Sequence, residues 1–238
     1  MTDKVKYALN FSLRRYYTTF ISLSTYLTYA YYTIEVLLRL QTNTARLFSR
    51  RALMKGMKKM KKHSQSALTG TKTEQYLKTA AQGEASAFTK YSLYSDIADE
   101  EGYQEISRTL SSIANNEREH AELWLGYLGQ LGSTEENLET AIATETFEST
   151  TFYPEAAKAA KEEGFDEIAQ KFSMTGSVEA DHACTQEKFL ESIRDGSIFK
   201  GDANTEWICL NCGYRTKGNT PPEHCPLCSY PKGYFAKI

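Results

Sequence analysis

Residues 117–120 read Glu-Arg-Glu-His and residues 179–182 read Glu-Ala-Asp-His, so a Glu-x-x-His motif recurs after 62 positions. Residues three apart on an α-helix point to the same side, so each motif offers a carboxylate and an imidazole from one helix face. Two such motifs on two equivalent helices predict a four-helix bundle that holds two metal ions.

The sequence around the two motifs repeats as well. Residues 98–106 (ADEEGYQEI) and residues 160–168 (AKEEGFDEI) are identical at six of nine positions. At the same offset Tyr91 corresponds to Tyr153, and Glu84 corresponds to Glu145 within one residue. The glycine after each Glu-Glu pair is a typical helix stop. Each half is therefore predicted to be a helical hairpin, and the two hairpins form an all-α bundle.

Four helices are expected between residues 71 and 195. Pro154 lies inside the third, where it predicts a kink, a local bulge or a break. The expected helices run from Thr71 or Thr73 through Ala98, from Tyr103 to about Gln130, from Ser133 or Thr134 to Glu163, and from Phe165 to about Asp195.

Charge is distributed unevenly along the 238 residues. Residues 1–68 carry 13 Lys or Arg and two acids, a net charge of +11, whereas residues 69–238 carry 15 Lys or Arg and 28 acids, a net charge of −13. An acidic main body argues against a nucleic-acid partner and is typical of a bundle lined with carboxylates. We expect a basic, tyrosine-rich extension over 1–68, the bundle over 69–195, a linker over 196–205 and a cysteine module over 206–238.

Residues 1–53 allow three interpretations. They form an extension outside the natural mature protein, which then starts at Met54, Met57 or Met60, or an interfacial or membrane anchor, or a disordered or loosely helical arm. Phe20 to Leu38 is apolar but contains Glu35 and several hydroxyl groups, so a membrane span is not favoured.

Seven side chains of the predicted bundle form a candidate metal site. They are Glu84, Glu117, His120, Glu145, Glu148, Glu179 and His182. A single Glu-x-x-His is usually solvated, but so many ionisable groups facing one interior are costly without cations. Carboxylates with one imidazole per metal favour two iron or manganese ions with open positions for oxygen or peroxide. Tyr91 and Tyr153 either donate hydrogen bonds to these carboxylates or are ordinary core tyrosines.

Four of the five cysteines have the spacing of one tetrahedral metal site. Cys209, Cys212, Cys225 and Cys228 form two C-x-x-C pairs twelve residues apart. Such thiols indicate a reducing compartment, so we expect a cytoplasmic protein. The fifth, Cys184, is expected to be a buried packing thiol.

Zinc is the simplest occupant of such a module, but two details favour iron. Cys212-Gly213-Tyr214 and Cys225-Pro226-Leu227-Cys228 resemble the two knuckles of rubredoxins, in which one iron passes single electrons. Trp207, Tyr214 and Phe235 are expected to form the aromatic core of this small domain.

With both sites placed, the stretch from about Thr71 to Ile238 resembles rubrerythrin. Besides the cysteine module, the matching residues are Gly83-Glu84, Ala87, Tyr91, Glu101-Gly102-Tyr103, residues 116–121 (NEREHA), residues 145–148 (ETFE), Tyr153, Glu163-Gly164-Phe165 and residues 179–182. The resemblance implies a ferritin-like di-iron bundle followed by a rubredoxin-like domain. It also implies a peroxidase that reduces hydrogen peroxide to water in defence against oxidative stress. NAD(P)H would be the ultimate donor, through a separate protein such as a rubredoxin or its reductase, and the chain would form a head-to-tail homodimer.

The same resemblance implies a role for each ligand. Glu117 and Glu179 would bridge the irons, Glu84 would bind the first iron, Glu145 and His182 the second, and His120 and Glu148 would exchange on the first iron as its oxidation state changes.

One departure and two alternatives remain beside this interpretation. Gly176 precedes the second motif where helix formers are usual, which predicts a local bulge.

The alternatives to a peroxidase are a ferritin-like iron-binding protein or ferroxidase, and a zinc-bearing scaffold without enzymatic activity. The cysteine module favours the peroxidase, because storage needs no dedicated one-electron donor.

Overall fold

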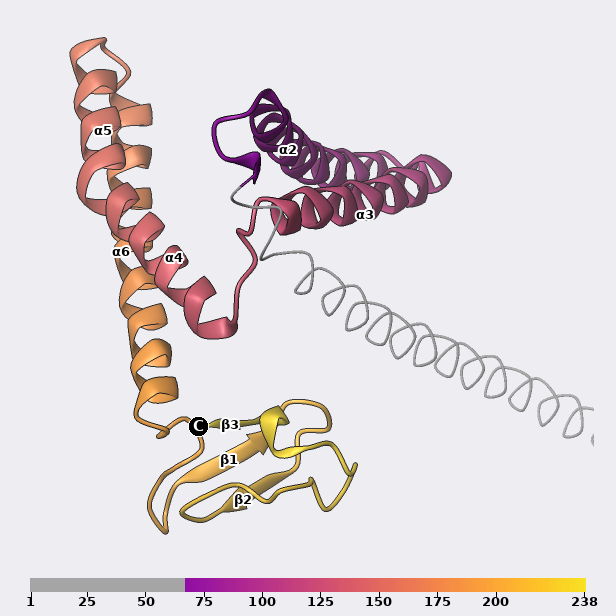
Figure 1. The fold of residues 1–238 in the computed structure, drawn as a ribbon, viewed down its shortest axis with the longest axis vertical. Helices are drawn as coiled ribbons and strands as arrows, with labels where there is room; N and C mark the ends of the chain where they lie inside the picture. Colours follow the sequence, from indigo (N-terminus) through magenta and orange to yellow (C-terminus); the bar gives the residue numbers. More distant parts are fainter. Residues whose placement is uncertain (1–66) are drawn as a thin grey trace, which may run out of the picture. The chain divides into compact units, whose positions relative to one another are not determined.

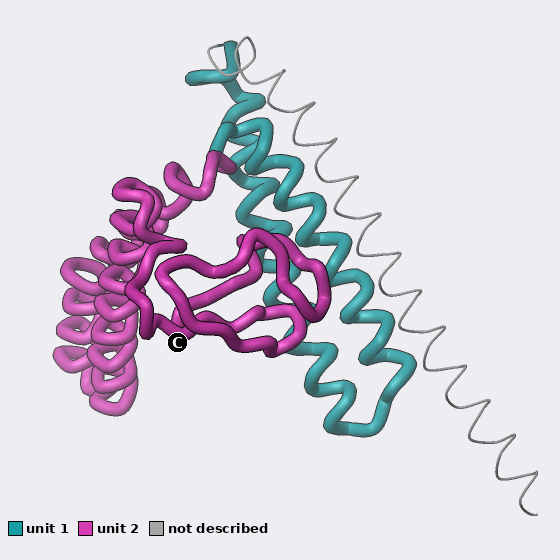
Figure 2. The backbone as a smooth tube through the Cα atoms, turned by 90° about the horizontal axis from the view of Figure 1, so that it is seen from below, with its two compact units in different colours: residues 1–130 teal, residues 131–238 magenta. Residues whose placement is uncertain are grey.

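The structure is a computed structural model that describes residues 67–238. The three interpretations of residues 1–53 lie outside the described residues. The chain divides after Gln130 into two compact units, shown in two colours in Figure 2. We describe each unit by itself. The four domain ranges expected from the sequence remain a prediction.

The described part of the first unit is a hairpin of two long helices, α2 (Lys72–Glu100) and α3 (Gln104–Tyr127), which lie side by side in Figure 1. Thr71 caps α2, as predicted, by accepting a 3.1 Å hydrogen bond from the Glu74 amide. Small side chains face the helix contact, and the buried ones are Ala81, Ala98, Ala114 and Ala121. Such small side chains let the two backbones approach closely, which brings long side chains from both helices to one place.

Both helical hairpins turn through the same backbone motif. Gly102 and Gly164 have φ values of +85° and +86°, in the left-handed region that favours glycine. The Tyr103 amide donates to the Ala98 carbonyl and the Phe165 amide to the Ala160 carbonyl, each at 2.8 Å. These are Schellman caps, so the predicted helix stops after the Glu-Glu pairs are confirmed.

The second hairpin packs three consecutive helical segments against one long helix, α6 (Asp166–Arg194). The segments are α4 (Thr134–Phe147), the π-helix η1 (Glu148–Phe152) and α5 (Tyr153–Glu162). The Tyr153 amide donates to the Glu148 carbonyl, five residues back, as a π-helix requires. The bulge predicted near Pro154 is thus confirmed as a π-helical turn that leads into α5.

The π-helix also explains a shift in the repeat. The offset between the halves is 61 residues at Glu84 and Glu145 but 62 at Tyr91 and Tyr153. The second half therefore contains one extra residue between these points, and η1 lies between them. A π-bulge is the way in which a helix accommodates one additional residue without ending.

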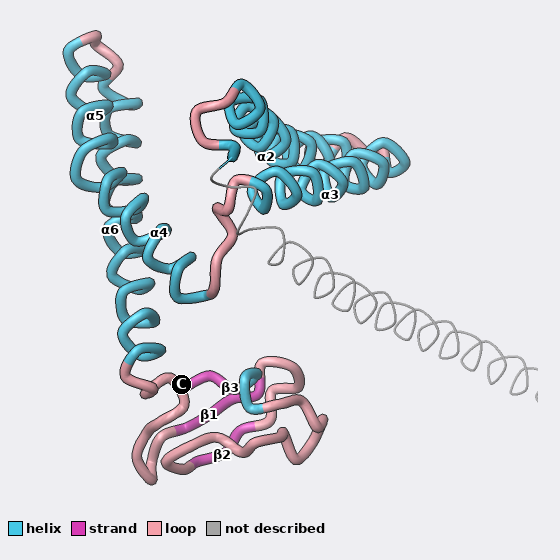
Figure 3. Tube along the Cα trace, viewed as in Figure 1, coloured by secondary structure: helices cyan, strands magenta, loops and turns pink. Residues whose placement is uncertain are grey.

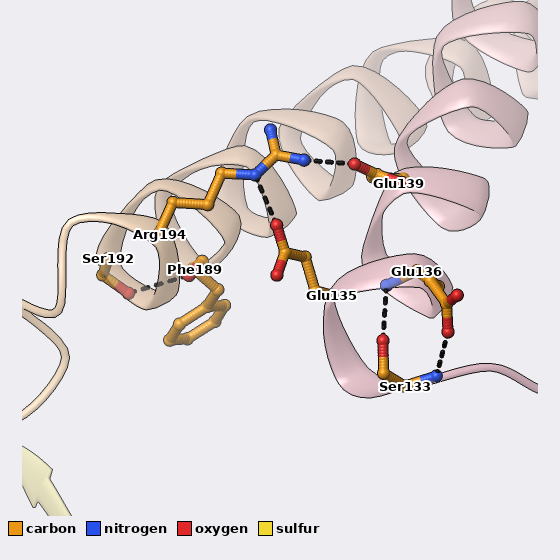
Figure 4. Close-up of polar contacts among 7 residues, drawn as sticks. All are labelled: Ser133, Glu135, Glu136, Glu139, Phe189, Ser192 and Arg194. Atoms are coloured by element: carbon orange, nitrogen blue, oxygen red, sulfur yellow. Dashed lines mark hydrogen bonds and ion pairs between the residues drawn. The ribbon is translucent and has the colours of Figure 1, made fainter.

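The open end of the second hairpin is held by polar contacts (Figure 4). Ser133 caps α4 in a capping box with Glu136, which confirms the predicted start of this helix. Near the end of α6, Arg194 pairs with Glu135 at 2.7 Å and also with Glu139. These groups are exposed, so we assign them a role in orienting the two helices and little stabilising energy.

The cysteine module is built mainly from loops around three short strands (Figure 3). They are β1 (Glu206–Cys209), β2 (Arg215–Lys217) and β3 (Phe235–Lys237), in the antiparallel order β2-β1-β3, with a 3-10 turn, η2 (Lys232–Tyr234), before β3. Trp207 is fully buried, and Phe235 and Tyr214 pack in the same cluster, so the predicted aromatic core is confirmed.

The bulge expected at Gly176 is absent, because α6 runs without interruption past this residue. The irregular turn lies in the facing segment, η1. A Cβ atom at Gly176 would lie 3.1 Å from Tyr153 Cβ, which is tighter than ordinary van der Waals contact. The equivalent residue of the first hairpin, Ala114, faces a regular helix. The absence of a side chain at Gly176 therefore leaves space for Tyr153, which directly follows the π-helix.

Among residues 67–238, no helix combines the length and the apolar character needed to cross a membrane.

Two helical glycines should respond differently to alanine. Gly83 has no neighbouring atom within 4 Å of an added Cβ, so Gly83→Ala should stabilise its hairpin by about 1 kcal/mol through helix propensity. Gly176→Ala should give no such gain, because its Cβ must displace Tyr153. Urea unfolding of the metal-free chain, followed by helical circular dichroism, measures both. Equal stabilisation by the two substitutions would contradict the close approach.

Candidate metal centres

The first unit brings three of the predicted ligands together. Glu84 comes from α2, and Glu117 and His120 come from one face of α3. His120 Nδ1 lies 3.1 Å from Glu117 Oε2 and 3.7 Å from Glu84 Oε2. All three residues offer a ligand atom within 4.8 Å of the other two.

The second unit repeats this arrangement with nearly the same distances. Glu145 comes from α4, and Glu179 and His182 come from α6. His182 Nδ1 lies 2.8 Å from Glu179 Oε2 and 3.8 Å from Glu145 Oε2. The sequence repeat is thus also a repeat of site geometry.

The acids of the first cluster compete for a proton. A hydrogen bond with Glu117 raises the pKa of Glu84, helped by burial and by the Glu117 charge, while His120 and Trp124 act in the opposite direction. The same hydrogen bond from Glu84, followed by that from His120, lowers the pKa of Glu117. Two carboxylates this close make the ionisation of both less favourable, and a bound cation removes that penalty. The donor set therefore fits a metal ion, and carboxylate oxygens with imidazole suit iron or manganese.

Glu148 is the one predicted bundle ligand outside these two clusters in the described chain. It is the first residue of η1, one turn after Glu145. A π-turn changes the direction in which following side chains point. The exchange of Glu148 with His120 remains a prediction.

The two predicted tyrosines lie in different surroundings. Burial raises the pKa of Tyr153, and the negative charges of Glu179, Glu148 and Glu145 raise it further. This phenol is therefore close to the second cluster and keeps its proton at neutral pH. The Tyr91 ring lies 6.2 Å from the ring of Tyr94. Hydrogen bonds from either phenol to the ligating carboxylates remain a prediction.

The four cysteines of the module converge on one point. Cys209 Sγ lies 3.8 Å from Cys228 Sγ, and Cys212 Sγ lies 3.6 Å from Cys225 Sγ. A tetrahedral ion with metal–sulfur bonds of about 2.3 Å requires sulfur–sulfur distances of about 3.8 Å. The spacing therefore fits one four-coordinate metal.

Backbone amides shape the electrostatics of this site. A hydrogen bond from the Tyr230 amide lowers the pKa of Cys228 to about 6. The Tyr214 amide acts similarly on Cys212, but burial and hydrogen bonds with the other thiols raise its pKa to about 12. The module thus stabilises thiolate on one knuckle even before a metal removes the remaining protons.

Cys184 is exposed, so its prediction as a buried packing thiol was wrong. Its neighbour Ala183 is one of the residues that α6 buries in the hairpin. Cys184 is the next residue, so its side chain is turned by about 100° around the helix axis, away from the buried face.

Two polar side chains beside the clusters were not singled out from the sequence. Trp124 Nε1 and Gln186 Oε1 are buried without a hydrogen-bond partner in the described part of the chain. The repeat itself carried the signal, because these residues are also 62 positions apart, each four after a motif histidine.

Comparisons with known proteins match both parts of the chain to one family. The rubrerythrin family matches residues 75–183 and 136–206, and its rubredoxin-like domain matches residues 207–236. The rubrerythrin of Porphyromonas gingivalis is 36% identical over 190 residues, which cover 74% of this chain and 95% of the relative. The rubrerythrin of Nitratidesulfovibrio vulgaris is 34% identical, covering 71% and 95%.

Two further matches are a relative and a solved structure. A putative rubrerythrin of Methanocaldococcus jannaschii is 38% identical, covering 64% of this chain and 86% of the relative. A structure of nigerythrin in a mixed-valence state is 27% identical and covers 71% of this chain and 88% of that one. Its TM-score of 0.28 is too low to bear on the arrangement of the helices.

The family matches span the paired Glu/Glu/His clusters of the helical hairpins and then the four-cysteine module, in the order in which the chain presents them. This chain, with a ferritin-like di-iron domain and a rubredoxin-like domain, belongs to the rubrerythrin family.

Proposed function

We propose that this protein reduces hydrogen peroxide to water at a di-iron centre, with electrons passed from iron in its cysteine module. One observation carries the proposal. A single chain contains two Glu/Glu/His clusters of matched geometry and a four-thiol site whose spacing fits one metal. The clusters alone would suit iron binding, but the thiol site adds a one-electron carrier.

The reaction fixes how many electrons and protons the site must supply. Reduction of one hydrogen peroxide to two water molecules consumes two electrons and two protons. Two ferrous ions held at the clusters would supply these two electrons. We assign Glu84, Glu117 and His120 to hold one ion, Glu145, Glu179 and His182 to hold the other, and Glu148 to the ligand exchange implied by the family.

The chain's own side chains would also hold and donate protons at the site. The hydrogen bond between Glu84 and Glu117 raises the pKa of Glu84 and lowers that of Glu117, so a proton bound to this pair would lie on Glu84 and would leave when a cation binds. Tyr153 stays protonated beside the second cluster, so its hydroxyl can donate to a carboxylate.

We also propose the route of the electrons. A four-thiolate iron carries one electron at a time, whereas NAD(P)H delivers a hydride. A separate protein, such as a rubredoxin or its NAD(P)H reductase, must therefore stand between them. A homodimer in a reducing, cytoplasmic compartment would let the cysteine module of one chain serve the di-iron site of its partner.

Removal of one ligand from either cluster should abolish peroxide turnover. Glu117→Ala and His182→Ala each remove one metal ligand from a cluster, so bundle iron should fall while the visible absorption of the cysteine iron stays. Anaerobic iron loading, metal analysis and peroxide consumption measure these effects. Glu119→Ala on the same helix is the matched control and should retain turnover, because Glu119 belongs to neither cluster. Normal turnover in both ligand variants would refute the assigned site.

The cysteine module should contain iron and be required for donor-driven turnover. Cys212→Ser should remove the red absorption of thiolate-to-iron charge transfer and stop turnover driven by NAD(P)H and donor proteins. Chemically reduced protein should still consume about one equivalent of peroxide per di-iron site in a single turnover. Zinc in place of iron, with no visible absorption in protein from its native source, would contradict the electron-transfer role.

A further inference from the structure

Two buried polar atoms stand out in the hairpins. Over residues 67–238, Trp124 Nε1 and Gln186 Oε1 are the buried side-chain nitrogen and oxygen atoms without a hydrogen-bond partner. Leaving such an atom unsatisfied is energetically unfavourable. An apolar side chain of similar size would avoid this cost, so packing alone does not account for a tryptophan and a glutamine at these positions.

The two residues occupy equivalent places in the repeat. Trp124 follows Glu117 by seven residues and His120 by four, and Gln186 follows Glu179 and His182 by the same intervals. Residues four and seven apart lie on one helix face. Each hairpin therefore places a side-chain N–H group one turn beyond its motif histidine, on the side that faces the preceding helix.

One of these groups reaches the acid that the facing helix contributes to its cluster. Gln186 Nε2 donates to Glu145 Oε1 at 3.5 Å, from α6 to α4, which is at the limit of hydrogen-bond distance. Trp124 has the equivalent position in the first hairpin, and its buried Nε1 has no hydrogen-bond partner in the described chain. Such contacts are commonly long before a site is loaded and shorten afterwards.

We propose that Trp124 and Gln186 are a matched pair of positioning residues that hold Glu84 and Glu145 as metal ligands, each through an N–H donated to the carboxylate. The proposal rests on the proposed function, because it requires metal at both clusters. Both donors are neutral, so they orient a carboxylate without competing with the cation for its charge. A lysine or arginine at either position would instead form an ion pair with the acid and weaken its bond to the metal.

The pair predicts separate effects on the two iron sites. Trp124→Phe keeps an aromatic ring and removes the N–H, and Gln186→Met keeps the chain length and removes the amide. Outer partners of metal ligands typically contribute 10–100-fold in affinity. In the full chain, loaded anaerobically with Fe(II), each variant should release one of the two bundle irons to a colorimetric chelator about tenfold faster. The double variant should release both.

A second readout separates positioning from a structural role. Trp124→Phe removes a buried unsatisfied group, so the melting temperature of the metal-free chain should not fall. In contrast, a packing role predicts a lower melting temperature and unchanged iron release. Trp207→Phe and Gln104→Met are the matched controls, since their N–H groups bond to Gly218 and Asp99, away from both clusters. Neither control should change the release of bundle iron.

Fluorescence can follow the first cluster directly. The chain has two tryptophans, so the Trp207→Phe variant leaves Trp124 as the sole emitter. Fe(II) bound at Glu84 should quench this emission, whereas Glu84→Gln should reduce the quenching.

The iron-release experiment distinguishes failure of this proposal from failure of the proposed function. If the unsubstituted chain binds two bundle irons and neither Trp124→Phe nor Gln186→Met changes their release, the positioning role of the pair is overturned and the proposed function is not. An unsubstituted chain that binds no bundle iron would overturn the proposed function as well.

Discussion

The candidate sites depend on carboxylates that the helices of each hairpin hold close together. Glu84 and Glu117 come from different helices of one hairpin, and the hydrogen bond between them raises the pKa of Glu84 and lowers that of Glu117. The second hairpin repeats the same cluster with Glu145, Glu179 and a histidine. Like charges at this distance repel strongly where water is partly excluded, so cations stabilise the loaded protein. The iron is thereby part of the stability of the site as well as its chemistry.

The packing of each hairpin creates this proximity. Buried alanines along α2 and α3 let the helix backbones lie close, and Schellman turns at Gly102 and Gly164 return the chain in the same register in both halves. The second hairpin differs by one inserted residue, which the π-helix absorbs beside Tyr153 and Gly176. Pseudo-symmetry therefore supplies two similar half-sites, and a single insertion makes them unequal where the extra acid Glu148 occurs.

Much of the site could be predicted from residue spacing. The six cluster ligands follow from the repeat because helical periodicity places residues three apart on one face, and the cysteine spacing defines one tetrahedral site. Cys184 and Gly176 were misjudged for a common reason. Whether a helical residue is buried, or a glycine is needed, depends on the facing helix, and local sequence does not contain that information. Trp124 and Gln186 were overlooked because neither is a usual metal ligand.

By itself, the sequence determined the hairpin repeat, the turn positions, the candidate metal ligands and the family, since all of these follow from local periodicity and motif spacing. Only the tertiary structure decided that the extra residue of the second half becomes a π-turn, that Gly176 makes room for Tyr153, that Gln186 donates to Glu145, and that the indole N–H of Trp124 is buried without a partner in the described chain. These features are contacts between residues far apart in the chain, and such contacts exist only when the helices pack.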